Sequence, residues 1–97
     1  MVDKASLERW RSLDSVLVLQ AIADHAKPDL TYSPIKTQRS SRWHANVNGQ
    51  DFELLLTGAK FWNTRQAVGG GGAIDLVIHL TGANFKDAVR LLNRRGL

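Results

Sequence analysis

The fold of this 97-residue chain is decided by residues 69–80, which read Gly-Gly-Gly-Gly-Ala-Ile-Asp-Leu-Val-Ile-His-Leu. Four consecutive glycines interrupt regular structure, because glycine loses the most backbone freedom when it is ordered. The apolar residues that follow have the spacing of an α-helix, and Asp75 falls in its first turn, where a negative charge suits the helix dipole. We therefore predict a turn at residues 69–72 and a helix over residues 73–80 that Gly82 ends.

A last helix follows the Gly82 stop. Asn84 can cap it, Asp87 stands at the third helical position, and Gly96 provides a second stop. Its apolar face is predicted to consist of Phe85, Ala88, Val89, Leu91 and Leu92.

Upstream of the glycines the pattern changes to that of strands. Residues 42–47 alternate between polar and apolar side chains, and Asn48-Gly49 is a strong hairpin signal because both residues tolerate a positive φ. Residues 51–56 form the returning strand, Thr57-Gly58 a second turn, and residues 60–64 a third strand. A meander of this kind buries one face and leaves the other exposed to water.

The first 41 residues read as two helices and a loop. Asp3 caps a helix to about Leu13, and either Asp14 or Ser15 caps a second helix over residues 16–26, which Pro28 stops. A polar loop with a short extended piece at residues 30–32 leads to the strands. The fold class is therefore α+β, a small three-stranded antiparallel sheet flanked by N-terminal and C-terminal helices, in one domain over residues 1–97.

Composition narrows the class of protein further. Hydrophobic residues make up 43% and charged residues 23% of the chain, which is typical of a soluble globular domain. No apolar run reaches the roughly 18–20 residues of a membrane helix, and the N-terminus lacks a signal peptide, so we expect a cytoplasmic protein without membrane contact. The chain has no cysteine, which excludes disulfides and thiolate zinc sites.

The net charge is +4, and the middle of the sequence is basic. No acid stands between Asp29 and Asp51, or between Glu53 and Asp75. Such a basic segment suits a polyanion, although a solvated basic surface explains it equally well.

Residues 61–77 resemble the second half of the zinc-binding (CHC2-type) domain of bacterial-type DNA primases. In that family a final strand carries two cysteines spaced C-x-x-C, and a glycine-rich turn and a helix that begins Ala-Ile-Asp follow it. Residues 84–92 are similar to the family's closing helix, and residues 33–36, Ser-Pro-Ile-Lys, to its C-P-x-H ligand pair. The resemblance covers roughly residues 13–97, with one extra hairpin around residues 43–58.

The resemblance also implies that the metal is lost. The family's four ligand positions fall on Ser33, Lys36, Thr64 and Ala67. Structural zinc takes four thiolate or imidazole ligands, and none of these residues supplies one. We therefore expect a degenerate, zinc-ribbon-like primase domain without zinc and without any other cofactor. The three histidines stand on separate elements and are better explained as ordinary surface or half-buried residues.

The function implied by the resemblance is contact with single-stranded DNA template, within or beside a primase or replication protein of a plasmid, phage or mobile element. Such contact needs cations for phosphate and aromatic faces for bases. The candidate nucleic-acid-binding residues are Lys36, Arg39, Arg42, Lys60, Trp62 and Arg65. On a two-residue period Phe61 is the core residue and Trp62 the stacking platform; alternatively, Trp62 packs under the loop that ends at Arg42.

Other functions have less support in the sequence. The glycine run can offer backbone amides to an anion, but a turn that permits close packing explains it as well, and the Lys-Ser/Thr of a nucleotide-binding loop is missing. We find no catalytic constellation and expect a non-enzymatic domain. The alternative is a protein–protein module that docks a polymerase, helicase or relaxase, or a primase catalytic domain.

Overall fold

The computed structural model describes residues 2–32 and 40–97 and contains one antiparallel sheet and four helices. The strand order is β1-β2-β3-β4-β5, so each strand pairs with its neighbour in sequence. In chain order the elements are α1 (Lys4–Ser12), α2 (Ser15–Ile22), β1 (His25–Pro28), β2 (Ser40–Val47), β3 (Gln50–Thr57), β4 (Lys60–Asn63), β5 (Val68–Gly71), α3 (Ala73–Thr81) and α4 (Phe85–Arg94). The α+β class is confirmed, but the sheet has five strands where three were predicted.

The predicted cap of the second helix, the Asn48-Gly49 turn and the Gly82 stop are all present, and each depends on local chemistry alone. The carboxylate of Asp14, not the Ser15 hydroxyl, caps α2 by accepting from the Val16 amide. The β2–β3 hairpin turns at Asn48 and Gly49, whose φ angles of 52° and 83° are positive as expected. Gly82 ends α3 in the left-handed conformation.

The first additional strand, β1, was missed because nothing in its sequence marks it. Residues 25–28 read His-Ala-Lys-Pro; the sequence predicts residues 25 and 26 as the end of the second helix and Pro28 as its stop, but the helix ends at Ile22. Pairing with β2 makes this segment a strand, with Ala26 opposite Ala45 and Pro28 opposite Trp43. The edge position tolerates a proline, since an edge strand needs fewer ladder hydrogen bonds. The extended piece predicted at residues 30–32 is also wrong, because Leu30 and Thr31 form a turn.

The second additional strand, β5, occupies most of the predicted glycine turn. It pairs with β4 so that Gly69 lies opposite Trp62 and Gly70 opposite Phe61. A Cβ at Gly69 would lie 2.6 Å from Trp62 Cε3, and one at Gly70 would lie 2.9 Å from Phe61 Cε1. The two aromatic rings therefore cover the two glycines from opposite faces of the sheet, an arrangement that stabilises glycine in a strand.

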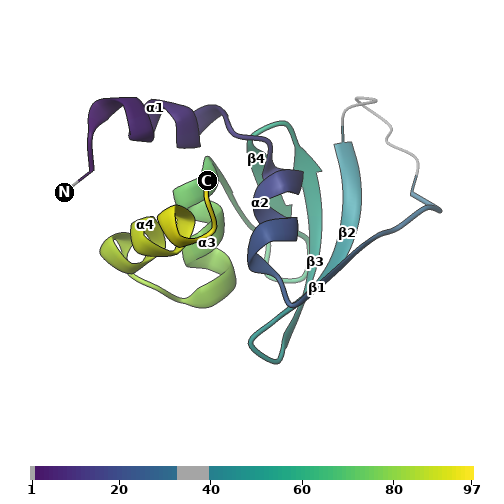
Figure 1. Ribbon diagram of the computed structural model, residues 1–97. Coiled ribbons are helices and arrows are strands. Elements are labelled where there is room, and N and C mark those ends of the chain that lie inside the picture. The colour runs from purple at the N-terminus through teal and green to yellow at the C-terminus, as the bar shows by residue number, and fades with distance from the viewer. Residues whose placement is uncertain (1, 33–39) are drawn as a thin grey trace.

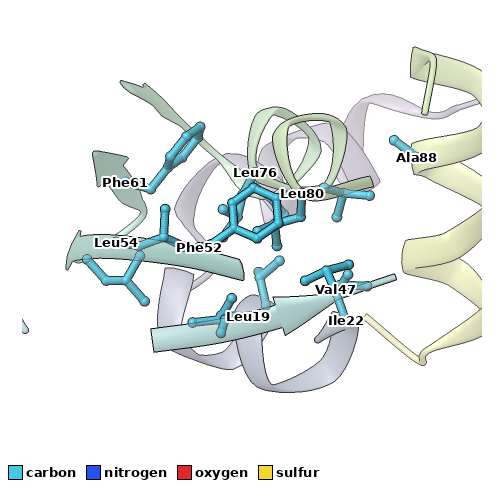
Figure 2. Packing of buried hydrophobic residues seen from close by; sticks show 14 of the residues in the cluster. Leu19, Ile22, Val47, Phe52, Leu54, Phe61, Leu76, Leu80 and Ala88 are labelled. Atoms are coloured by element: carbon cyan, nitrogen blue, oxygen red, sulfur yellow. The ribbon is translucent and has the colours of Figure 1, made fainter. Parts of the chain in front are cut away.

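All four helices lie on one side of the sheet (Figure 1), and the hydrophobic core lies between the helices and the sheet. Phe52, Leu54 and Phe61 project from the sheet toward Leu76 and Leu80 of α3, with Leu19 and Ile22 of α2 alongside (Figure 2). Phe61 is 5% exposed, as predicted for the core member of the Phe61–Trp62 pair.

The loops between strands are tied to the helices. The Gly58 carbonyl accepts from both the amide and the hydroxyl of Ser15, and the Gly72 amide donates to the Ala59 carbonyl. These bonds fix the β3–β4 turn against the starts of α2 and α3. No helix in residues 2–32 and 40–97 has the length and apolar character needed to cross a bilayer.

Candidate nucleic-acid interface

The face of the sheet away from the helices is not covered by any described element (Figure 1). Directly opposed residues of an antiparallel pair share a face. One cross-strand row of this open face therefore consists of Arg42, Leu55, Trp62 and Gly69, from β2 to β5. The buried residues Trp43, Leu54 and Phe61 alternate with this row and point toward the helices.

Trp62 is the aromatic residue of this face. It is 45% exposed, whereas Trp10 and Trp43 are buried. Its ring crosses the position where Gly69 lacks a side chain, so contact with β5 holds one part of the indole and leaves the remainder open to solvent. Because the Trp62 side chain is already held in place, it loses little conformational entropy when a ligand stacks on it. It is therefore a suitable platform for a planar ligand.

Arg42 lies on the same face but is already engaged by acids. Its guanidinium forms an ion pair with Glu53 of β3 and lies 3.9 Å from the Asp29 carboxylate. Hydrogen bonds from the Thr31 hydroxyl and amide, with further help from Arg42 and His44, lower the pKa of Asp29. The sequence between Asp29 and Asp51 contains no acid, but in the folded protein the β2–β3 hairpin places Glu53 beside Arg42. This segment is therefore not free of acids in space.

The remaining candidate cations differ in how available they are. Arg65 is exposed and lies 3.5 Å from Glu53, so it shares that carboxylate with Arg42. Lys60 at the start of β4 and Lys27 on β1 form no ion pair with any described acid. The sequence did not indicate Lys27 as a candidate residue, because β1 was not predicted. Lys36 and Arg39, like Ser33, lie outside the described residues.

The Thr64 and Ala67 positions, where the resemblance would place two metal ligands, lie in the turn between β4 and β5. Asn63, which is 2% exposed, organises this turn: its side-chain oxygen accepts from the amides of Arg65 and Gln66, at 3.0 and 3.1 Å. Ala67 completes the turn with a φ of 55°. Sequence reasoning missed Asn63, although a buried asparagine before a turn is a recognised way to satisfy turn amides.

The side-chain nitrogen of Asn63 connects the turn to α3. It donates to Nε2 of His79 at 2.8 Å, so the neutral His79 carries its proton on Nδ1. The His79 ring also packs against Phe52 and Phe61, with centroid distances of 5.7 and 5.2 Å. Burial lowers the pKa of His79. This histidine is therefore a half-buried structural residue, as the sequence suggested for all three.

Acidification is expected to destabilise the protein through His79. A histidine whose folded pKa lies below its ordinary value of 6.5 contributes stability that is complete above pH 6.5. That stability is lost as the pH falls below 6.5, because the unfolded chain then binds the proton more readily. Urea unfolding between about pH 5 and 8 measures the slope. His79→Gln keeps an acceptor for Asn63 without a titrating group and should flatten it; an unchanged slope would contradict the assignment.

Within residues 2–32 and 40–97 no three His, Asp or Glu side chains come together as a metal site would require. No protein-family model, curated protein or solved structure matches the chain. The case for a function therefore depends on the residues of the open face.

Proposed function

We propose that the open sheet face binds single-stranded nucleic acid, as a zinc-free relative of the primase zinc-binding domain would, in a replication protein of a plasmid, phage or mobile element. The observation that carries this proposal is Trp62, an exposed indole whose ring packs against Gly69 of β5. Unpaired bases stack on such rings regardless of sequence, and open antiparallel sheets with surface aromatics are a common platform for them. Single-stranded DNA is the ligand that the resemblance favours.

The open face also supplies phosphate contacts, though fewer than the sequence suggested. Lys27 and Lys60 stand at opposite corners of the face, and the row that contains Trp62 crosses between them. A strand that passes over Trp62 can reach both ammonium groups. Arg42 and Arg65 are held by Glu53 and serve in this proposal to position the ligand, with less counterion release than free cations would give.

The salt dependence of binding tests this division of roles. Two phosphate contacts predict a slope of log K against log salt of about −1.4 on a single strand, and each further contact by Lys36 or Arg39 adds about −0.7. The probe is a fluorescein-labelled oligothymidylate, followed by anisotropy at several salt concentrations. Absence of binding at low salt would overturn the proposal.

Trp62→Ala is expected to weaken oligothymidylate binding by roughly 1–3 kcal/mol, the usual contribution of one stacked base. Trp62→Phe should retain most of the affinity, because a smaller aromatic face remains. Since the other two tryptophans are buried, quenching of the intrinsic fluorescence reports on Trp62 directly.

The matched control is Phe85→Ala, which removes a comparably exposed aromatic ring from the helical side of the molecule. It should bind oligothymidylate as the wild type does. If Trp62→Ala binds with unchanged affinity, or if Phe85→Ala loses as much, the open face is not the nucleic-acid site.

A further inference from the structure

The helical layer carries a second surface, which we call the Phe85 groove. Two adjoining hollows of about 250 and 580 Å³ share Leu7 of α1 and Phe85 of α4. In Figure 1, α1 runs above α3 and α4 on the side away from the sheet. The apolar residues that line the groove include Val2, Leu7, Ile74, Ile78, Phe85 and Val89.

Phe85 is the residue that the fold does not account for. It is 51% exposed, although α4 already buries Ala88, Val89 and Leu92 in the core. Asn84 anchors the backbone at this point, because it caps α4 immediately before Phe85 by accepting from the Asp87 amide. A large ring at an anchored helix start and open to solvent is the kind of side chain that contributes to interfaces.

The rim of the groove is basic. Lys86 and Arg90, one helical turn apart on α4, border one hollow, and Arg11 at the end of α1 borders the other. Asp75 lies on the wall, and Asp87 approaches Arg90 to 3.7 Å, but that pair is exposed and therefore weak. The electrostatic preference of this surface is for a negatively charged partner.

The shape and charge together select one kind of occupant. A second copy of this chain would bring its own Lys86 and Arg90 against these cations, which opposes self-association. Nucleic acid matches the charge but makes little use of a groove in which Phe85 is flanked by aliphatic side chains. A peptide with apolar anchors satisfies both features.

We infer that the Phe85 groove binds a short amphipathic segment of another protein, with two or three apolar anchors at helical spacing and acidic residues beside them. Helix-in-groove recognition uses this pattern of anchors. A segment of about ten residues, roughly 15 Å long as a helix, is comparable in length to α1 and α4, which border the groove. This inference does not depend on the proposed nucleic-acid site, which lies on the opposite face of the sheet.

The test is a selection of displayed random 14-residue peptides on the 97-residue chain. Enriched peptides are then synthesised, labelled and titrated by anisotropy. We expect enrichment of apolar residues spaced i, i+3 or i+4, with a net negative charge. Phe85→Ala should weaken the best peptide at least about tenfold. Trp62→Ala is the matched control and should bind it normally. Thermal melting of Phe85→Ala, which removes a half-exposed ring, checks that the fold is retained.

A charge swap identifies the rim. The Lys86→Glu, Arg90→Glu double variant should bind the acidic peptide at least tenfold more weakly and recover affinity when the peptide's acids are replaced by lysine. The inference is overturned if no peptide is enriched. It is also overturned if peptide affinity is unchanged in both Phe85→Ala and the charge-swap variant. It is also overturned if oligothymidylate displaces the peptide and itself loses affinity for Phe85→Ala, because the groove would then belong to nucleic acid.

Discussion

Gly69→Ala is expected to lower the free energy of unfolding by about 1–3 kcal/mol, the usual cost of forcing an extra methyl group into a packed site. The new Cβ would lie 2.6 Å from Cε3 of Trp62 and 2.9 Å from the Phe61 carbonyl oxygen. The indole can turn aside, but the carbonyl belongs to the β4 backbone and cannot move without disturbing the ladder. The variant should therefore lose stability and also release Trp62 from β5.

Gly71→Ala is the matched control, two residues along the same strand and on the same face. Its nearest neighbour would be Lys60 Cγ at 3.8 Å, which is an ordinary contact. The unfolded chain loses freedom when glycine is replaced, so we expect unchanged stability or a gain of about 0.4–1 kcal/mol. Urea unfolding of both variants provides the comparison, and the tryptophan emission of Gly69→Ala should shift to the red. Equal stabilities would mean that β5 does not pack under Trp62.

Asn63→Ala is expected to have the largest effect on stability of the changes considered. The side chain makes three hydrogen bonds from a buried position, to the Arg65 and Gln66 amides and to His79. Each of these part-buried hydrogen bonds contributes about 0.5–1.5 kcal/mol, so their combined loss should lower the free energy of unfolding by about 2 kcal/mol or more in urea unfolding. The β4–β5 turn would lose its organising acceptor, which should also displace Arg65.

Asn63→Asp separates the two roles of this side chain. A carboxylate still accepts from the two turn amides, but it presents a negative oxygen to His79 and raises the pKa of that histidine. Stability then rises as the pH falls through the raised folded value, the opposite of the acid-induced loss expected for the wild type. If Asn63→Asp shows the wild-type pH profile, the contact between Asn63 and His79 does not exist in solution.

Parts of the candidate site could be predicted from short-range pattern. The alternation of Phe61 and Trp62 placed one ring in the core and the other on the surface, and the structure agrees. The partners of the cations could not be predicted in this way. Arg42 meets Glu53 only because the Asn48-Gly49 turn sets the register that places Arg42 opposite Leu55 and His44 opposite Glu53. A one-residue slip would move all of these side chains to the other face.

The two missed strands have the same explanation. Residues 25–28 have no alternating pattern, and glycine is unfavourable in a strand, so local preference predicted helix and turn. Pairing of β1 with β2 and of β5 with β4 overrides that local preference, because the ladder hydrogen bonds stabilise both strands. In β5 the rings of Phe61 and Trp62 also pack over the glycines. Both rings belong to β4, which precedes the glycines in the chain.

The sequence by itself determined the helices after the glycine run, their caps and stops, the Asn48-Gly49 hairpin, and which residue of the Phe61–Trp62 pair is buried. These features depend on interactions within about four residues, whose energies local chemistry specifies. Only the tertiary structure decided that the glycine run is a strand, that Glu53 engages Arg42 and Arg65, and that Leu7 and Phe85 form one groove. Each of these depends on contacts between segments distant in sequence, which a linear pattern does not encode.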